Sequence, residues 1–153
     1  MPPTATERIE FYLLPAADER WRLKHACRLA EEAYLAGEHV LVALDNAAQM
    51  QSFDEMLWTF ADRSFVPHEP YRDDQQWHET PVLLGCDPHP HEVFDVLVNL
   101  GSEVPVAAAL ARRIAEIIDA DEVRRRAGRV RFRHYRDAGL TPQTHNISAD
   151  QAT

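Results

Sequence analysis

The sequence has few cysteines, few glycines and no long apolar run. Its two cysteines, Cys27 and Cys86, are too few for a disulfide framework in a chain of 153 residues, which favours free thiols and a cytoplasmic protein. A membrane-spanning helix needs about 20 consecutive apolar residues. No segment approaches that length, so we expect no contact with a membrane. Residues 1–10 lack the apolar core of a secretory signal, in keeping with a cytoplasmic location.

The shortage of glycine argues against a nucleotide-binding enzyme. In α/β proteins, nucleotide phosphates bind where a glycine-rich turn after the first strand lets the backbone approach them closely. The corresponding segment, 14–18, reads LPAAD, and none of the five glycines belongs to a GxGxxG or P-loop pattern. The spacing of the remaining residues suggests no nucleophile and base pair. We therefore expect a non-catalytic binding protein without a cofactor.

A metal-dependent enzyme is one alternative that the sequence leaves open. His89 and His91 flank a proline in a predicted turn, and Cys86 lies close to them. Zinc requires four ligands of fixed geometry, and a His-x-His pair interrupted by proline is a weak indication of that geometry. We expect no metal site here, and measurement of bound zinc would decide the question.

Helical and strand patterns alternate along the chain. Apolar runs predict strands at 8–14, 39–44, 81–86 and 94–100, with a short helical or irregular piece near 106–109. Residues 112–118 fit either a helix or a strand, and their isoleucine-rich end favours a strand. Helical spacing of apolar residues predicts helices at 19–36, capped by Asp18, and from Asp45 or Asn46 to about Phe60. This alternation predicts a single α/β domain of the Rossmann-like type, with three α/β/α layers and a mainly parallel sheet. We expect the domain to span 1–140, followed by a polar tail at 141–153 with little order.

The net charge of −9 is unevenly distributed. Residues 121–139 carry seven arginines and three acidic side chains, whereas residues 1–120 carry nine basic and twenty-one acidic side chains. An acidic protein is poorly suited to bind bare nucleic acid, because phosphate contacts dominate that affinity. The basic segment therefore favours an acidic peptide as its ligand, with direct binding of single-stranded nucleic acid as the alternative.

The basic segment, DEVRRRAGRVRFRHYRDAG, has the pattern of one amphipathic helix that ends at Gly139. Four apolar residues share one side of a helical wheel, which we expect to pack on the domain: Val123, Ala127, Val130 and Ala138. The other side places Phe132 among Arg125, Arg129, Arg133 and Arg136. An aromatic ring beside several guanidinium groups suits a partner that is both anionic and apolar. The simpler alternative is a run of solvated arginines.

Residues 61–80 form the longest segment without a clear helix or strand pattern, and loops of such length are often functional. Phe65, Val66 and Pro67 make an apolar cluster near Trp58 at the end of the preceding helix. Aromatic residues gathered at a surface are candidates for a protein interface. The simpler alternative is that they cover an edge of the core.

Four short motifs, taken together, resemble the chi subunit of bacterial DNA polymerase III holoenzyme from about Phe11 to Leu140. They are FYLL at 11–14, LW at 57–58, SFVPH at 64–68, and YR followed by AG at 135–139. Each motif alone is weak, but their order and spacing are specific. The resemblance implies a Rossmann-like fold and a replisome adaptor without catalytic activity.

The resemblance also implies two partners. Chi-like proteins pair with a small psi subunit, which links them to the clamp loader, and they bind the acidic C-terminal tail of single-stranded DNA-binding protein, which ends in a phenylalanine carboxylate. The residues that match the family's tail site are Arg125, Arg129, Phe132, Arg133 and Arg136. Those that match the psi contact are Trp58, Phe65, Val66, Pro67 and His68. The family often has tyrosine where this chain has Phe132, so a hydrogen bond from the phenol hydroxyl is absent here.

Overall fold

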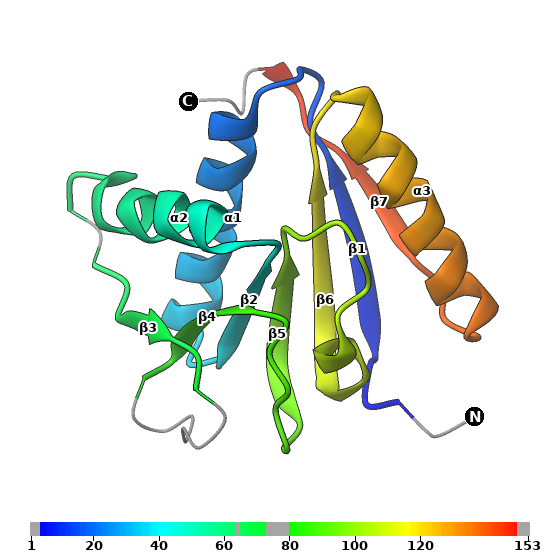
Figure 1. The fold of residues 1–153 in the computed structure, drawn as a ribbon, viewed down its shortest axis with the longest axis horizontal. Coiled ribbons are helices and arrows are strands. Elements are labelled where there is room, and N and C mark those ends of the chain that lie inside the picture. Colours follow the sequence, from blue (N-terminus) through cyan, green and yellow to red (C-terminus); the bar gives the residue numbers. More distant parts are fainter. Residues whose placement is uncertain (1–3, 64, 73–79, 150–153) are drawn as a thin grey trace.

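The computed structural model describes residues 4–63, 65–72 and 80–149, and these form one parallel sheet with helices on both faces (Figure 1). The sheet has seven strands in the order β3-β4-β2-β5-β6-β1-β7, and each pair of neighbours runs parallel. The strands are β1 (Arg8–Leu13), β2 (Val40–Leu44), β3 (His68–Pro70), β4 (Val82–Cys86), β5 (Phe94–Asn99), β6 (Ala111–Ile118) and β7 (Gln143–Asn146). The predicted α/β fold is confirmed.

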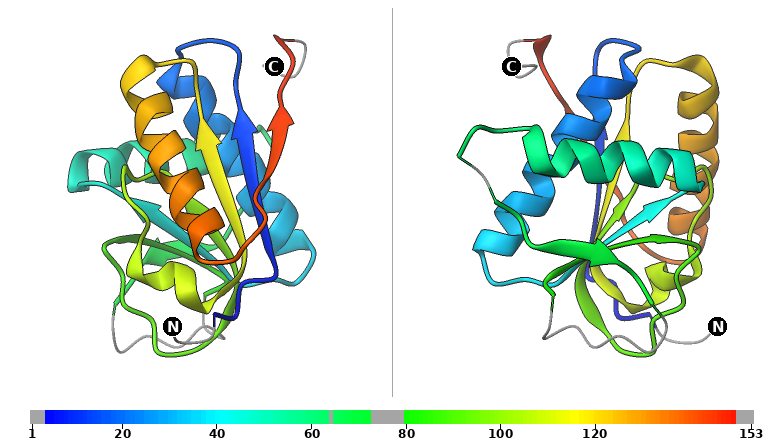
Figure 2. Two further views of the ribbon diagram at one scale, coloured as in Figure 1. Left: turned by 90° about the vertical axis from the view of Figure 1, so that its right-hand side faces the viewer. Right: turned by 60° about the vertical axis from the view of Figure 1, so that its left-hand side comes forward.

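The helices divide between the two faces of the sheet (Figures 1 and 2). Helices α1 (Glu19–Leu35) and α2 (Ala47–Thr59) cover one face, while α3 (Glu122–Asp137) and the short 3-10 helix η1 (Val106–Leu110) cover the other. Alternate residues of β2 enter different core clusters, since Val40 and Val42 pack toward α1 and α2, and Leu41 packs toward α3 and η1. The expected three layers are therefore present.

The ends of the helices follow from local sequence. Side chains of Asp18, Asn46 and Asp121 accept hydrogen bonds from backbone N–H groups three residues later, at 2.9–3.0 Å. Asn46, rather than Asp45, is therefore the cap of α2. Gly139 ends α3 with a φ of +89°, a conformation that is costly for residues with a Cβ.

Two strands were not expected from the sequence. β3 lies within the predicted irregular loop and pairs with β4. β7 lies within the tail that was expected to have little order, so that expectation is wrong for 143–146. Polar β7 residues show no apolar alternation; the strand is ordered by backbone pairing with β1, and by a 2.9 Å contact between His145 Nε2 and Glu10 Oε2.

The side of α3 that packs on the sheet also differs from the predicted one. Val123 and Val130 are 70% and 55% exposed, whereas Gly128, Arg131 and Tyr135 are buried. The Arg131 guanidinium and the Tyr135 hydroxyl both bind buried Glu116 of β6, which satisfies their polar groups inside the protein. The apolar pattern misassigned the face because a polar network, rather than an apolar stripe, attaches this helix.

Candidate functional site

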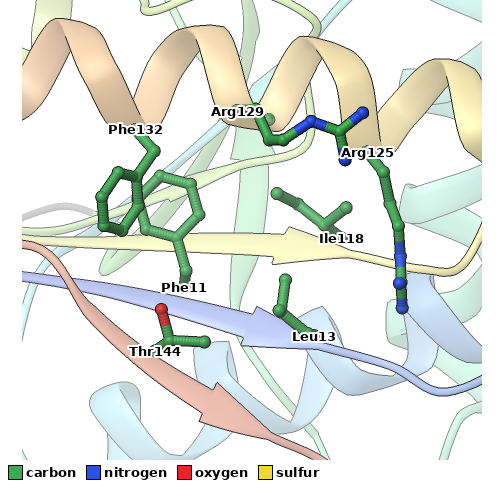
Figure 3. A pocket seen from close by; sticks show the side chains of 8 residues that line it. Phe11, Leu13, Ile118, Arg125, Arg129, Phe132 and Thr144 are labelled. Carbon is green, nitrogen blue, oxygen red and sulfur yellow. The ribbon is translucent and has the colours of Figure 1, made fainter.

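A pocket of about 230 Å³ lies between α3 and the edge of the sheet formed by β1 and β7 (Figure 3). It is lined by Phe11, Leu13, Ile118, Arg125, Gly128, Arg129, Phe132 and Thr144. The two strands β1 and β6 contribute an apolar floor, and α3 contributes two guanidinium groups and a phenyl ring. Three of the five residues predicted for the tail site therefore meet at one pocket.

Phe132 forms one wall of this pocket. Its half-buried ring lies 5.2 Å from the buried ring of Phe11, measured between centroids, with the two planes tilted by 59°. Phe11 in turn lies 6.0 Å from Tyr135 in an edge-on arrangement. This packing supports the Phe132 ring from below and leaves part of it facing the pocket, where another ring can contact it.

Arg125 and Arg129 lie at the end of the pocket away from Phe132 (Figure 3). Arg125 donates through Nε to the carbonyl of Asp119 at 3.1 Å and through a terminal nitrogen to the carbonyl of Leu14 at 3.2 Å. These acceptors are neutral, so they hold the side chain in place without neutralising its charge. Exposed Arg129 makes no ion pair within the described part of the chain. Both cations therefore remain available to an anionic ligand.

Arg133 and Arg136 are exposed and do not line the pocket. They lie further along α3, where Arg136 Nε is 3.9 Å from Asp137 Oδ1 and both side chains are largely in water. An exposed contact of this length contributes little free energy. The two residues extend the positive surface of α3 beyond Phe132 without shaping the cavity.

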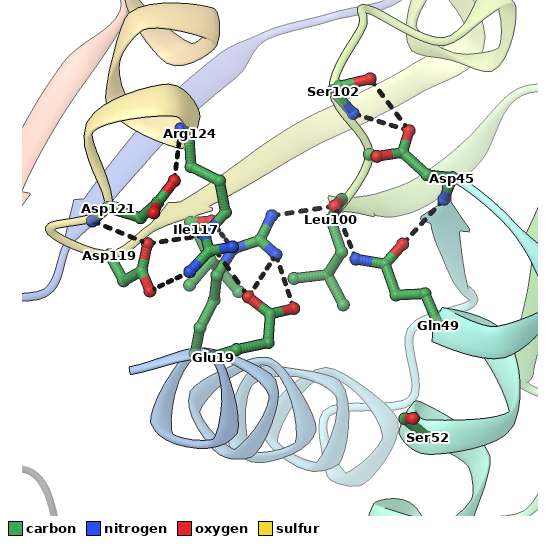
Figure 4. Close-up of polar contacts among 12 residues, drawn as sticks. Glu19, Asp45, Gln49, Ser52, Leu100, Ser102, Ile117, Asp119, Asp121 and Arg124 are labelled. Carbon is green, nitrogen blue, oxygen red and sulfur yellow. Dashed lines mark hydrogen bonds and ion pairs between the residues drawn. The ribbon is translucent and has the colours of Figure 1, made fainter. Parts of the chain in front are cut away.

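Two other arginines of α3 are held by internal carboxylates. Arg124 donates to both oxygens of buried Asp119, at 2.7 and 2.6 Å (Figure 4). Burial alone would raise the pKa of Asp119, but hydrogen bonds from Arg124 and from the backbone N–H of Asp121 hold that pKa below its usual value. Arg131 donates from Nε to Glu116 at 2.9 Å. These pairs attach α3 to the sheet and are not available to a ligand.

Glu116 is the centre of a buried network that sequence reasoning missed. Its carboxylate accepts hydrogen bonds from Arg131, from the Tyr135 hydroxyl at 2.7 Å and from Asn99 Nδ2 at 3.0 Å. Burial, followed by the charge of Glu116, raises the pKa of Tyr135, so the phenol stays protonated as the donor. A glutamate within an isoleucine-rich strand is the signal that indicates a buried polar partner.

Gly128 and the strand residues of the pocket were also missed. A Cβ added at Gly128 would overlap Cδ1 of Ile118, so glycine allows α3 to approach β6 closely at the pocket. Phe11 and Leu13 come from β1, far from α3 in sequence, and Thr144 comes from β7, which follows α3 and pairs with β1. No local pattern connects these positions, because only the sheet topology brings them together.

The second predicted surface lies on the opposite face of the sheet. Trp58 and Phe65 are 53% and 62% exposed, with ring centroids 5.6 Å apart, and the His68 ring lies 4.8 Å from Trp58. Trp58, Phe65 and His68 are hereafter the aromatic cluster. Pro67 is half-buried beside it, whereas Val66 and the side chain of His68 are buried and so are not themselves contact surfaces. No finding tests whether these residues bind a partner, so this role stays a prediction.

The carboxyl ends of β2, β4 and β5 form a polar crevice, the usual ligand position of an open parallel sheet. Its lining includes Asp45, Asp87 and Glu103, which would repel a phosphate, and Asp45 is already bound to the backbone N–H and hydroxyl of Ser102 (Figure 4). Burial and the nearby Asp45 charge raise the pKa of the Cys86 thiol, which disfavours a nucleophilic thiolate.

The three residues of the metal hypothesis do not form a ligand set. Over residues 4–63, 65–72 and 80–149, no three histidine, cysteine or acidic side chains are grouped so that they could hold a metal ion. His89 instead lies 3.4 Å from Asp87, with both side chains exposed.

Within the residues that the structure describes, no helix is long and apolar enough to cross a membrane.

Similar solved structures support the fold. T4 UvsW aligns with a TM-score of 0.63 and 12% identity over 94% of this chain and 42% of that one. A DEAD box protein from Methanococcus jannaschii aligns with a TM-score of 0.58 and 12% identity, covering 90% of this chain and 42% of that one. The C-terminal domain of the DEAD-box protein Dbp5 aligns with a TM-score of 0.56 and 7% identity, covering 94% of this chain and 91% of that one. At such identities, the similarity concerns the fold alone.

Sequence comparison defines the family. The family model described as DNA polymerase III chi subunit, HolC, matches residues 6–143. DNA polymerase III subunit chi of Pseudomonas aeruginosa is 37% identical over 140 residues, which cover 92% of this chain and 96% of that protein. The Escherichia coli K12 protein of the same name is 24% identical over 118 residues, which cover 77% of this chain and 80% of that protein. The chain therefore belongs to the DNA polymerase III chi subunit family, and it is an accessory subunit of DNA replication.

Proposed function

We propose that this protein is a non-catalytic replisome adaptor. One surface, the pocket beside α3, binds the acidic C-terminal tail of single-stranded DNA-binding protein. The other, the aromatic cluster, binds a psi subunit and thereby the clamp loader. The observation that carries the proposal is an apolar pocket bordered by Arg125 and Arg129, whose charges no carboxylate of the described chain neutralises.

The pocket suits the end of a tail that combines a phenyl ring with carboxylates. The terminal ring enters the pocket beside the packed pair of Phe132 and Phe11, and lies against Leu13 and Ile118. The terminal carboxylate meets Arg125 and Arg129, and upstream aspartates meet the more exposed arginines of α3. The aromatic wall depends on the ring of Phe132 and its packing on Phe11, so it is retained without the hydroxyl of the family's tyrosine.

Several weak contacts must act together in this mode of binding. Individual exposed ion pairs contribute about 0.2–1 kcal/mol each, and a flexible tail loses conformational freedom when it docks. We therefore expect a dissociation constant on the order of micromolar and a clear dependence on salt.

The position of the two surfaces is compatible with an adaptor. α3 covers one face of the sheet, whereas the aromatic cluster lies at α2 and β3 on the other side (Figure 1). Both partners can therefore be bound at the same time. The exposed rings of Trp58 and Phe65 favour contact by burial of apolar area, which depends little on salt.

Titration of a fluorescent acidic peptide ending in phenylalanine tests the tail site. We expect the double variant Arg129→Ala/Arg133→Ala to bind about two- to thirtyfold more weakly than the wild type, since two cationic contacts of about 0.2–1 kcal/mol each are removed. Arg126→Ala is the matched control, because Arg126 is exposed on the same helix but pairs with Glu122 and does not line the pocket. Equal affinities of wild type and double variant would contradict the assignment.

A naked single-stranded oligonucleotide, tested at physiological salt, separates the alternative function. Rings and guanidinium groups can also stack on bases and bind phosphates. Tight binding of the oligonucleotide without a protein partner, lost in the same double variant, would favour direct nucleic-acid binding over the adaptor role.

A further inference from the structure

β7 is the last strand at one edge of the sheet, next to the pocket beside α3 (Figures 1 and 2). On its inner side it pairs with β1, and the backbone N–H of Ile147, just after β7, donates to the carbonyl of Leu13 at 2.9 Å. The backbone groups of successive residues in a parallel strand point alternately to its two sides. Those of His145 therefore also point to β1, whereas the N–H and C=O groups of Thr144 and Asn146 point outward.

The outer side of β7 is open to another extended chain. Within the residues that the structure describes, no strand pairs with it, and Thr144 and Asn146 are both exposed. Outward donors and acceptors of this kind are a template for an added strand. β7 has the sequence QTHN, without the lysine or proline that often blocks a sheet edge. The edge can therefore accept the backbone of a partner.

Thr144 connects this edge to the pocket. Its side chain lines the pocket, and it lies opposite Phe11 of β1, whose ring also faces the pocket (Figure 3). An added strand continues the sheet, so every second side chain of that strand also points to the side of α3. Because threonine is short, a ring carried by the added strand has room to pass over it and reach the pocket.

The charges along the edge fit an acidic peptide. Arg125 and Arg129 line the pocket, and Arg136 follows Arg129 by about two helical turns, on the same side of α3. β7 carries no acidic side chain of its own. Glu10 of β1, which contacts β7, is already paired with Arg113 at 2.8 Å. Acidic residues of an added strand would therefore face guanidinium groups.

The direction of the peptide follows from the course of α3. Phe132 packs on Phe11, whereas Arg125, earlier in the helix, reaches the carbonyl of Leu14, so α3 runs opposite to β1. A tail with its carboxylate at Arg125 and its upstream residues near Arg136 therefore runs in the same direction as β1 and β7. Such a tail continues the sheet as a further parallel strand.

We propose that the acidic tail binds as an extended strand, paired in parallel with the outer edge of β7, while its terminal ring enters the pocket. This inference deepens the proposed function of the pocket beside α3 and rests on it. The backbone groups of Thr144 and Asn146 are the protein's side of the pairing. Pairing fixes the backbone of the tail, so that its side chains at alternate positions meet the arginines of α3 together.

Amide hydrogen exchange, followed by nuclear magnetic resonance of the ¹⁵N-labelled protein, tests the pairing directly. With a saturating acidic peptide that ends in phenylalanine, we expect exchange of the Thr144 and Asn146 N–H groups to slow at least about tenfold, because both become hydrogen-bonded. The amides of His145 and Ile147, which face β1, are the internal reference and should change little. Peptide binding without slower exchange at Thr144 and Asn146 would overturn the inference and leave the proposed function intact.

A proline at position 146 tests the same pairing by titration. Asn146→Pro removes one outward donor, and Asn146 neither lines the pocket nor donates its N–H to β1. We expect the peptide to bind about two- to tenfold more weakly, the scale of one lost hydrogen bond. Asn146→Ala keeps the N–H group and is the matched control, which should bind within about twofold of the wild type. Equal affinities of the two variants, with His145 and Ile147 still protected, would contradict the pairing.

Two further results would exclude the inference in different ways. If the peptide does not bind to the wild type at all, the proposed function of the pocket fails, and the pairing fails with it. Analytical ultracentrifugation of the protein without peptide tests a second copy of the chain as the occupant of the edge. A dimer that Asn146→Pro dissociates would show that β7 pairs with its counterpart in another molecule and not with the tail.

Discussion

Gly128 of α3 lies directly against Ile118 of β6, so close that a Cβ at position 128 would overlap the Cδ1 atom of Ile118. Both residues also line the pocket beside α3. Because Gly128 has no side chain, the Cδ1 atom of Ile118 fits against the helix at this point of the pocket lining. Two changes to this pair should therefore compensate each other.

Gly128→Ala should destabilise the protein even though alanine favours helices. The gain in helix propensity is about 1 kcal/mol, whereas forced overlap in a packed core costs about 1–3 kcal/mol. Ile118→Val removes the colliding Cδ1 atom and alone costs about 0.5–1.5 kcal/mol. We expect the double variant to be more stable than Gly128→Ala. Urea unfolding of the four proteins measures the coupling, and simple additivity would show that the contact is not restrictive.

The Glu116 network should respond strongly to the loss of its cation. Arg131→Ala leaves the carboxylate of Glu116 buried without its charged partner, a loss of about 3–5 kcal/mol in the free energy of unfolding. Tyr135→Phe removes one neutral donor and should cost about 1–3 kcal/mol. Exposed Arg126→Ala on the same helix is the control and should change stability by less than about 0.5 kcal/mol. Similar effects of the Arg131 and Arg126 changes would mean that the network does not attach α3.

The Asp119 and Arg124 pair should contribute stability that acid removes. The folded-state pKa of Asp119 is lowered, so its stabilising effect is present above the unfolded-state value and is lost as pH falls through the folded value. We expect Asp119→Asn to lower stability at neutral pH and to weaken its decline as pH falls below about 4. Urea unfolding across this range is the measurement. Parallel curves for the two proteins would contradict the assignment.

Phe132 should contribute to tail binding through its ring and not through a hydroxyl. Phe132→Ala removes the wall that packs on Phe11 and should weaken binding of the acidic peptide at least about tenfold, by the scale of a buried aromatic contact. Phe132→Tyr keeps the ring and should bind within about threefold of the wild type. Affinities from peptide titration, with circular dichroism to verify folding, provide the test. A loss in Phe132→Tyr equal to that in Phe132→Ala would show that the ring does not face the ligand as proposed.

The two surfaces should also differ in their response to salt. The Debye length, beyond which exposed charges are largely screened from each other, is about 8 Å at physiological salt and becomes shorter as salt is added. Peptide binding beside α3 should therefore weaken with added sodium chloride, whereas psi binding at Trp58 and Phe65 should change little. Phe65→Ala should abolish psi pull-down and leave peptide binding unchanged. Loss of both activities together would indicate that the surfaces are not independent.

Most regular elements of this protein could be predicted because their signals are local. An apolar run defines β2, and the cap at Asp18 places the start of α1. β3 and β7 could not be found in this way. Their few residues carry no apolar alternation, and they become strands by pairing with β4 and β1 at the edges of the sheet.

By itself, the sequence determined the α/β alternation, the concentration of positive charge in one helix and the presence of a phenylalanine among its arginines. Only the tertiary structure decided which side of that helix faces the sheet and which arginines remain free. Asp119 and Glu116 come from β6 and its end, and they approach Arg124 and Arg131 only when α3 docks. The pairing of charges therefore depends on a long-range contact, whereas the charges themselves are a property of the chain.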